Sequence, residues 1–199
     1  MASGMTYTMT ETSQLSTAEY YGKALCELGA EHKDVVALTA DLAKSTKIGM
    51  FGEKFPDRFF NVGIAEQNMF GVAAGLAKNG LIPFASTFAI FASARSLDQV
   101  HTDICYQNVP VKIIATHAGT SFGQAGSTHH SLIDMTCMRV LPHMTVICPC
   151  DGAETYHAVK AAYETPGPVY IRINRGFDQI IYKNLEDCSF EAVSYTHLR

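Results

Sequence analysis

One carboxylate in this sequence, Glu66, stands where a side chain could take part in acid–base chemistry. It follows Gly63-Ile64-Ala65, and the residues after it are rich in Ala, Gly, Val and Met, which predicts that Glu66 begins a helix. The helix dipole alone also favours a carboxylate at that position. Glu66 is therefore either a reacting group or an ordinary helix N-terminal residue.

Two aromatic residues, Phe88 and Phe91, follow a predicted strand and are three residues apart. At that spacing they share one face of a helix. Core packing explains such a pair, and so does a platform for a flat heterocyclic ligand. The sequence leaves both interpretations open.

Three histidines flank a glycine-rich stretch at 119–126, namely His117, His129 and His130. The G-x3-G-x2-G spacing of this stretch differs from both a dinucleotide-binding fingerprint and a P-loop. Adjacent histidines such as His129 and His130 rarely point at one metal ion. We therefore favour acid–base and hydrogen-bonding roles and expect no metal site in this chain.

Arg175 lies beyond the last predicted strand, next to Gly176, where a guanidinium could clamp an anion or could simply be exposed. Cys148 and Cys150 have the spacing that puts two thiols on one face of a strand. We interpret the six cysteines as small buried side chains of a reduced, cytoplasmic protein rather than as a redox or metal pair.

These residues need elements that bring them together, and the sequence alternates short apolar runs with helical patterns. The strands are continuous apolar runs, which is typical of a parallel sheet covered on both faces. The pattern predicts a doubly wound α/β domain, with its binding site beyond the carboxyl ends of the strands. We expect strands at 35–39, 59–62, 83–87, 111–116, 144–148 and 169–173. A first helix should begin at the capping box Ser16-Thr17-Ala18-Glu19, and further helices are expected at 66–78, 92–106, 131–139 and 152–164.

Composition excludes several classes of protein. The 199 residues are 47% hydrophobic and 17% charged, which suits a buried core. With a net charge of −4 and scattered basic residues, the chain has no nucleic-acid-binding signature, and no apolar run is long enough for a membrane span. We expect a flexible leader at 1–14, one domain at 15–182, and a linker or the start of a missing C-terminal domain at 183–199.

Seven motifs occur in the order in which they occur in the pyrimidine-binding domain of the transketolase family. The resemblance covers about residues 15–180 and is greatest to the C-terminal subunit of split, two-subunit transketolases. The motifs are Ala40-Asp41-Leu42, Phe60-Asn61-Val62-Gly63-Ile64-Ala65-Glu66-Gln67-Asn68, Thr87-Phe88, Ala115-Thr116-His117, Ser127-Thr128-His129-His130, Arg139-Val140-Leu141-Pro142 and Val169-Tyr170-Ile171-Arg172.

The resemblance implies a thiamine diphosphate-dependent enzyme that transfers a two-carbon ketol unit from a ketose, often phosphorylated, to an aldose. Glu66 matches the family's catalytic glutamate, which hydrogen-bonds a ring nitrogen of the cofactor's aminopyrimidine. Phe88 and Phe91 match the residues that hold the pyrimidine ring, and Asp41 matches an acidic residue near the cofactor.

The resemblance also implies substrate contacts. His117 and His129 match histidines that face the sugar, and the positions of Ser45 and Arg175 match those that bind its phosphate. In many transketolases Ala18 is replaced by an arginine of the phosphate clamp and Ala125 by an aspartate that contacts a hydroxyl. We therefore expect a modified sugar or sugar acid as an alternative to the standard pentose phosphates.

The family's Gly-Asp-Gly…Asn metal motif does not occur in this sequence. Mg²⁺ and the diphosphate are therefore expected on an N-terminal partner subunit, in an α2β2 assembly, and the chain alone is expected to be inactive. Residues 184–199 are too few for the family's third domain, which suggests a truncated sequence. The alternatives are a deoxyxylulose-phosphate synthase-like subunit, a 2-oxo-acid dehydrogenase β-like subunit, and a non-catalytic homologue.

Overall fold

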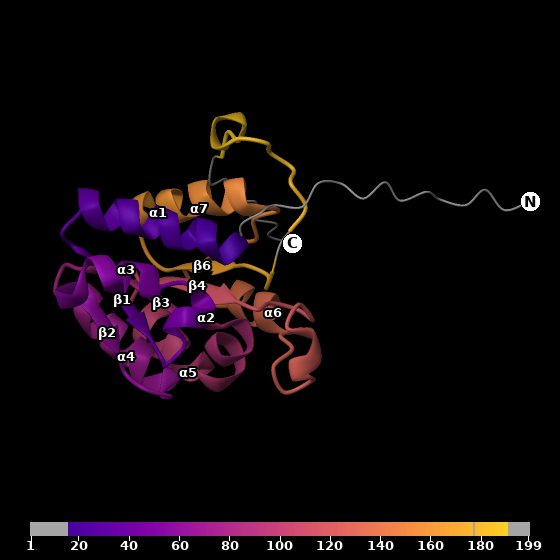
Figure 1. The fold of residues 1–199 in the computed structure, drawn as a ribbon. Coiled ribbons are helices and arrows are strands. Elements are labelled where there is room, and N and C mark those ends of the chain that lie inside the picture. Colours follow the sequence, from indigo (N-terminus) through magenta and orange to yellow (C-terminus); the bar gives the residue numbers. More distant parts are fainter. Residues whose placement is uncertain (1–15, 177, 191–199) are drawn as a thin grey trace, which may run out of the picture.

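A computed structural model describes residues 16–176 and 178–190, and it is built around one sheet of parallel strands (Figure 1). The sheet has six strands in the order β2-β1-β3-β4-β6-β5. The predicted doubly wound α/β fold is therefore confirmed. The strands are β1 (Val35–Thr39), β2 (Phe59–Asn61), β3 (Ile82–Phe88), β4 (Lys112–Thr116), β5 (Thr145–Ile147) and β6 (Val169–Arg172).

Parallel pairing brings the carboxyl ends of the strands to one edge of the sheet. Thr39 pairs with Ser86, and Phe88 pairs with Thr116. Ala115 pairs with Arg172, so β6 ends at the same edge. Since all pairs are parallel, the loops that follow β1, β2, β3, β4 and β6 emerge on one side of the molecule.

Helices cover both faces of the sheet, which explains why the central strands β1 and β4 are buried along their whole length. One face packs against α1 (Thr17–Glu31), α3 (Gly49–Lys54) and α7 (Gly152–Glu164). The other packs against α4 (Glu66–Lys78), α6 (Asp134–Arg139) and the helical segments η2 (Phe91–Arg95) and η3 (Val100–Cys105). Figure 1 shows α1 and α7 side by side over the sheet.

The contact between α1 and α7 depends on one glycine. The ring of Tyr20 lies against Gly152, where any Cβ would collide with it. At the start of α1, the backbone amide of Ser16 donates to Oε2 of Glu19 at 2.8 Å, as the predicted capping box requires.

The expected helix at 92–106 is not continuous. It is a π-helical turn, η2, then the short α5 (Leu97–Gln99), and then a second π-helical segment, η3. Serine hydroxyls compete for the backbone here: Ser93 donates to the Ala89 carbonyl at 2.7 Å, and Ser96 donates to the Phe91 carbonyl at 3.1 Å.

Three other expectations from the sequence are wrong. Helix α6 begins at Asp134 rather than at 131, because Ser131 forms an antiparallel bridge with Gly119. Strand β5 ends at Ile147, and Pro149 has no amide to continue the pairing. Cys148 and Cys150 are consequently exposed free thiols rather than buried strand residues.

Some expectations lie outside the described residues. These are the flexible leader predicted at 1–14 and the last residues, 191–199, of the predicted C-terminal segment. The domain boundaries at 15–182 and 183–199 stay predictions. Within the described ranges, no helix combines the length and apolar character needed to cross a membrane. The remaining short elements are α2 (Ala43–Thr46) and the 3-10 turns η1 (Pro56–Arg58), η4 (Gly123–Ala125) and η5 (Leu185–Asp187).

Candidate active site at the carboxyl edge of the sheet

Glu66 is the first residue of α4 and follows the carboxyl end of β2. Its side chain is only 2% exposed, and its Oε2 accepts a hydrogen bond from Nη1 of Arg95 at 2.8 Å. A buried carboxylate without a cation or several donors is costly, so this ion pair accounts for its presence there. Oε1 accepts no hydrogen bond from the described residues and is left for another donor.

Arg95 connects this carboxylate to the aromatic residues after β3. Its guanidinium carbon lies 3.9 Å from the centroid of the Phe91 ring, within the range of a cation–π contact. The Phe91 ring in turn stacks on Phe88, with centroids 5.7 Å apart and planes inclined by 27°. Glu66, Arg95, Phe91 and Phe88 therefore form one continuous chain of contacts.

The histidines complete an aromatic cluster at the same edge. The centroid of His117 lies 4.1 Å from that of Phe88, and the centroid of His129 lies 5.4 Å from that of Phe91. Phe122, from the glycine-rich loop, lies 4.7 Å from His117 and 5.4 Å from His129. We call Phe88, Phe91, His117, Phe122 and His129 the aromatic cluster.

His117 follows β4 directly and has a left-handed backbone, with φ at 58°. It is 6% exposed, and its Nδ1 lies 2.8 Å from the hydroxyl of Thr116. Burial, followed by the nearby Arg175 and His129, lowers the pKa of the His117 imidazole from 6.5 to about 4. At neutral pH His117 is thus an uncharged hydrogen-bonding group.

The glycine-rich loop that carries Phe122 and His129 is anchored at several points. His130 is within 3.1 Å of the Gly123 carbonyl through Nε2, and the hydroxyl of Thr128 lies 2.9 Å from Nδ1 of His129. Arg175 contacts the same loop: its guanidinium carbon lies 5.0 Å from the centroid of the Phe122 ring.

A buried ion pair fixes the base of this loop. Arg172, the last residue of β6, donates from Nε to Oδ2 of Asp134 at 2.8 Å. The hydroxyl of Tyr170 donates to the same carboxylate oxygen at 3.0 Å. The pair ties the start of α6 to the end of β6, directly beyond the segment of His129 and His130.

Asp41 and Ser45 are less closely tied to the cluster. Asp41 follows β1 with φ at 60°, and its backbone amide donates to Oδ1 of Asn61 at 3.0 Å. Ser45 is exposed on α2. No contact within the described residues links either side chain to the aromatic cluster. Ala18 is buried in α1, and Ala125 is half-buried in η4.

Two residues of the site, Arg95 and Phe122, are absent from our sequence-based predictions. Arg95 is four residues after Phe91, a spacing that places two side chains on the same helical face. Phe122 is an aromatic residue inside a glycine-rich loop at the binding edge. Both signals are visible in the sequence, but each is too weak to identify a site without the structure.

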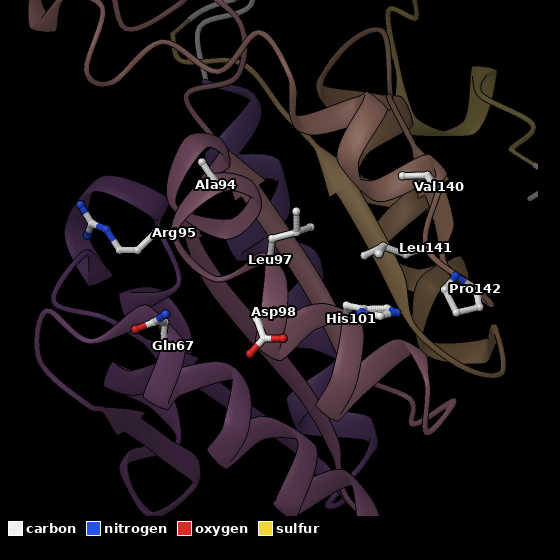
Figure 2. Close-up of a pocket in the computed structure, with 9 residues that line it drawn as sticks. All are labelled: Gln67, Ala94, Arg95, Leu97, Asp98, His101, Val140, Leu141 and Pro142. Atoms are coloured by element: carbon white, nitrogen blue, oxygen red, sulfur yellow. The ribbon is translucent and has the colours of Figure 1, made fainter.

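A hollow of about 640 Å³ opens beside the ion pair, between α5, η3 and the turn that follows α6. Figure 2 shows Arg95 and Gln67 on one side of it and His101, Leu141 and Pro142 on the other. Within residues 16–176 and 178–190, no three His, Cys, Asp or Glu side chains converge as a metal site would require.

The sequence matches one known protein family and is similar to several curated proteins. Residues 13–177 match the family described as "Transketolase, pyrimidine binding domain". The chain is 46% identical over 171 residues to a Methanocaldococcus jannaschii protein provisionally described as a transketolase C-terminal section, covering 86% of this chain and 54% of that protein. It is 38% identical over 172 residues to a subunit of the apulose-4-phosphate transketolase of Phocaeicola vulgatus, covering 86% of this chain and 55% of that protein.

A third curated relative is the 1-deoxy-D-xylulose-5-phosphate synthase of Dictyoglomus turgidum, which is 40% identical over 158 residues, covering 79% of this chain and 25% of that enzyme. Among solved structures, a split gene transketolase described as an inactive beta4 tetramer superposes with a TM-score of 0.77. It is 50% identical and is matched over 90% of this chain and 57% of its own. The chain spans about half the length of the first two curated relatives.

Proposed function

Because this chain belongs to the transketolase family through its pyrimidine-binding domain, we propose that it is the pyrimidine-binding subunit of a split transketolase. The reaction is the transfer of a two-carbon ketol unit from a ketose phosphate to an aldose, with thiamine diphosphate as cofactor. The observation that carries the proposal is the buried Glu66 carboxylate, with Oε2 paired to Arg95 and Oε1 unpaired among the described residues, beside the aromatic cluster.

The donor set of this edge fits an aminopyrimidine ring. Such a ring needs a flat apolar support and a carboxylate beside a ring nitrogen, and the stacked pair Phe88 and Phe91 with Glu66 has both. The Thr87 hydroxyl, next to Phe88, is buried without a hydrogen-bond partner among the described residues. Thiamine diphosphate, when bound, supplies the nucleophilic carbon that accepts the transferred unit.

In this proposal the residues of the chain have distinct tasks. Glu66 holds a proton between Oε1 and the ring nitrogen, which is general acid–base work by a carboxylate shielded from water. Phe88 and Phe91 support the ring. Asp41 lies near the cofactor at the end of β1.

The remaining site residues serve the sugar. His117 and His129 are catalytic and hydrogen-bond its hydroxyl and carbonyl oxygens; His117 does so as a neutral imidazole, as its lowered pKa of about 4 requires. Ser45 and Arg175 bind the phosphate end. Because Ala18 and Ala125 add no charge to this region, we propose a modified ketose phosphate as the donor; the Phocaeicola relative is named for one such sugar, apulose 4-phosphate.

The partner in this proposal is an N-terminal subunit that binds the diphosphate and Mg²⁺, in an α2β2 assembly. One curated relative is described as the C-terminal section of a transketolase, and another as one subunit of such an enzyme. We infer that the chain is inactive without this partner. A deoxyxylulose-phosphate synthase is the second candidate, favoured by the match to the Dictyoglomus enzyme, and it would consume pyruvate instead of a ketose.

The test uses the purified pair of subunits with thiamine diphosphate and Mg²⁺. Ketose-dependent turnover is measured for wild type, Glu66→Gln and the exposed control Glu53→Gln. We expect turnover in wild type and the control and a loss of at least about 100-fold in Glu66→Gln. Turnover of pyruvate with a triose phosphate as acceptor, without turnover of a ketose, would identify the synthase, and equal turnover in Glu66→Gln would refute the role of Glu66.

A further inference from the structure

We propose that Arg95 is a positioning residue for Glu66: it holds Oε2 and leaves Oε1 to face the ring nitrogen of the cofactor. This inference rests on the proposed function, because it assumes that Glu66 meets an aminopyrimidine. The 2.8 Å bond from Nη1 reaches only Oε2, and the carboxylate is 2% exposed. When a guanidinium fixes one oxygen of a carboxylate, the orientation of the second oxygen is fixed as well.

Arg95 is itself held in place from two sides. Its guanidinium lies over the Phe91 ring at 3.9 Å, so the ring that supports the cofactor also supports the arginine. Arg95 is the last residue of the π-helical turn η2, so this turn determines where its side chain leaves the backbone. The Ser96 hydroxyl stabilises the turn by donating to the Phe91 carbonyl at 3.1 Å. π-Helical turns recur at functional sites, where they shift side chains out of the ordinary helical register.

No other described charge competes with Arg95 for this carboxylate. Strands β1 and β3, which pack against α4, carry no ionisable side chain. The neighbouring segments α5 and η3 carry Asp98, His101, Asp103 and the buried thiol of Cys105, and none of these forms a hydrogen bond or ion pair with Glu66. On α4 itself, Lys78 lies at the opposite end of the helix.

The pairing has a consequence for proton balance. The Arg95 guanidinium offsets the charge of the Glu66 carboxylate in this ion pair, so the proton later shared between Oε1 and the ring nitrogen is taken up from the solvent. Without Arg95, a buried carboxylate lacks a cation and already favours its neutral form. Cofactor binding to Arg95→Gln should therefore take up fewer protons from solution than binding to wild type.

Isothermal titration of thiamine diphosphate, with Mg²⁺ present, into the assembled pair of subunits tests this inference. Titrations in two buffers of different ionisation enthalpy give the number of protons taken up with each cofactor. The variants are Arg95→Gln, Arg95→Lys, Glu66→Gln and the control Lys78→Gln, which removes a charge from the far end of α4.

We expect Arg95→Gln to weaken binding about tenfold, the loss typical of a hydrogen bond to a charged group. It should also lower proton uptake by an appreciable fraction of one proton. Arg95→Lys keeps the charge and should restore most of the uptake, while Lys78→Gln should match wild type in both quantities. Glu66→Gln should abolish the uptake assigned to this site.

The results separate this inference from the proposed function. If Glu66→Gln changes affinity and proton uptake but Arg95→Gln does not, Arg95 has no positioning role, while the role of Glu66 stands. If Glu66→Gln leaves both quantities at their wild-type values, the proposed function itself is wrong. If Arg95→Gln and Arg95→Lys lose affinity equally with unchanged proton uptake, Arg95 is only a structural support.

Discussion

The imidazole of His117 lies against the phenyl ring of Phe88, with centroids 4.1 Å apart and planes inclined by 36°. The contact excludes water from a titratable ring that no described carboxylate contacts. The Thr116 hydroxyl lies 2.8 Å from its Nδ1. An imidazole in this setting is kept neutral by burial.

Stability should therefore depend on pH through His117. Its folded-state pKa of about 4 is below the ordinary 6.5, so between these values the unfolded chain binds the proton and the folded chain does not. Stability falls as the pH drops from 6.5 to 4, by at most about 3 kcal/mol. Urea unfolding of wild type and His117→Asn across this range measures the effect, and asparagine tolerates the left-handed backbone.

A matched control is His143→Asn, because His143 is an exposed histidine that also has a positive φ of 63°. This variant should keep the wild-type pH dependence, whereas His117→Asn should flatten it. Parallel curves for wild type and His117→Asn would contradict the account of His117 as a buried neutral group.

The Asp134–Arg172 pair should be worth more to stability than any exposed pair. Asp134 is 1% exposed and also accepts from Tyr170, so its carboxylate is the centre of a buried network. Asp134→Asn leaves the Arg172 guanidinium without its counter-ion and should lower the free energy of unfolding by about 3 kcal/mol. Denaturant unfolding compares it with the exposed control Asp57→Asn, which should change stability by less than about 0.5 kcal/mol. A loss no greater than that of the control would show that the network is not stabilising.

The parts of the fold that depend on local pattern were predictable from the sequence. The apolar run at 35–39 and the capping box at Ser16 each carry their own signal, and both elements are present. The interruptions at Ser93 and Ser96 were not predictable, because they depend on which carbonyl each hydroxyl reaches. Helix and strand preferences contain no such information.

The site, like the fold, has a part that the sequence predicts and a part that it does not. Phe88, Phe91, His117 and His129 were predicted as neighbours because parallel strands end at one edge, and they are in contact. The partner of Glu66 was missed, because Arg95 lies 29 residues away in sequence and its contact depends on how η2 packs against α4. Long-range side-chain pairing of this kind is fixed by tertiary packing and not by local pattern.

Lys112 offers a second pH test, in the alkaline range. Its side chain is fully buried in β4, and Nζ donates to the carbonyls of Thr165 at 2.6 Å and Gly167 at 2.8 Å. Burial lowers its pKa from 10.5 to about 8, so between these values the unfolded chain binds more protons and stability rises with pH. Relative to Lys112→Met, wild type should gain up to about 3 kcal/mol from pH 8 to 10.5. A constant difference between the two proteins over that range would contradict this assignment.

Arg175 should govern affinity for phosphorylated sugars more than the chemical step. Arg175 is exposed, and its guanidinium carbon lies 5.0 Å from the Phe122 centroid. The backbone amide of Arg175 donates to the Ser121 hydroxyl at 3.0 Å, which fixes the backbone at this position. A guanidinium placed this way binds a phosphate well, and with alanine at position 18 it has less help from other cations. In the assembled enzyme, Arg175→Gln should raise KM for a ketose phosphate about tenfold, with little change in kcat.

The same variant should alter KM for the unphosphorylated ketose by less than about twofold, and the exposed control Arg139→Gln should leave both values unchanged. An equal rise in KM for both sugars would show that Arg175 supports the loop of Phe122 rather than the phosphate.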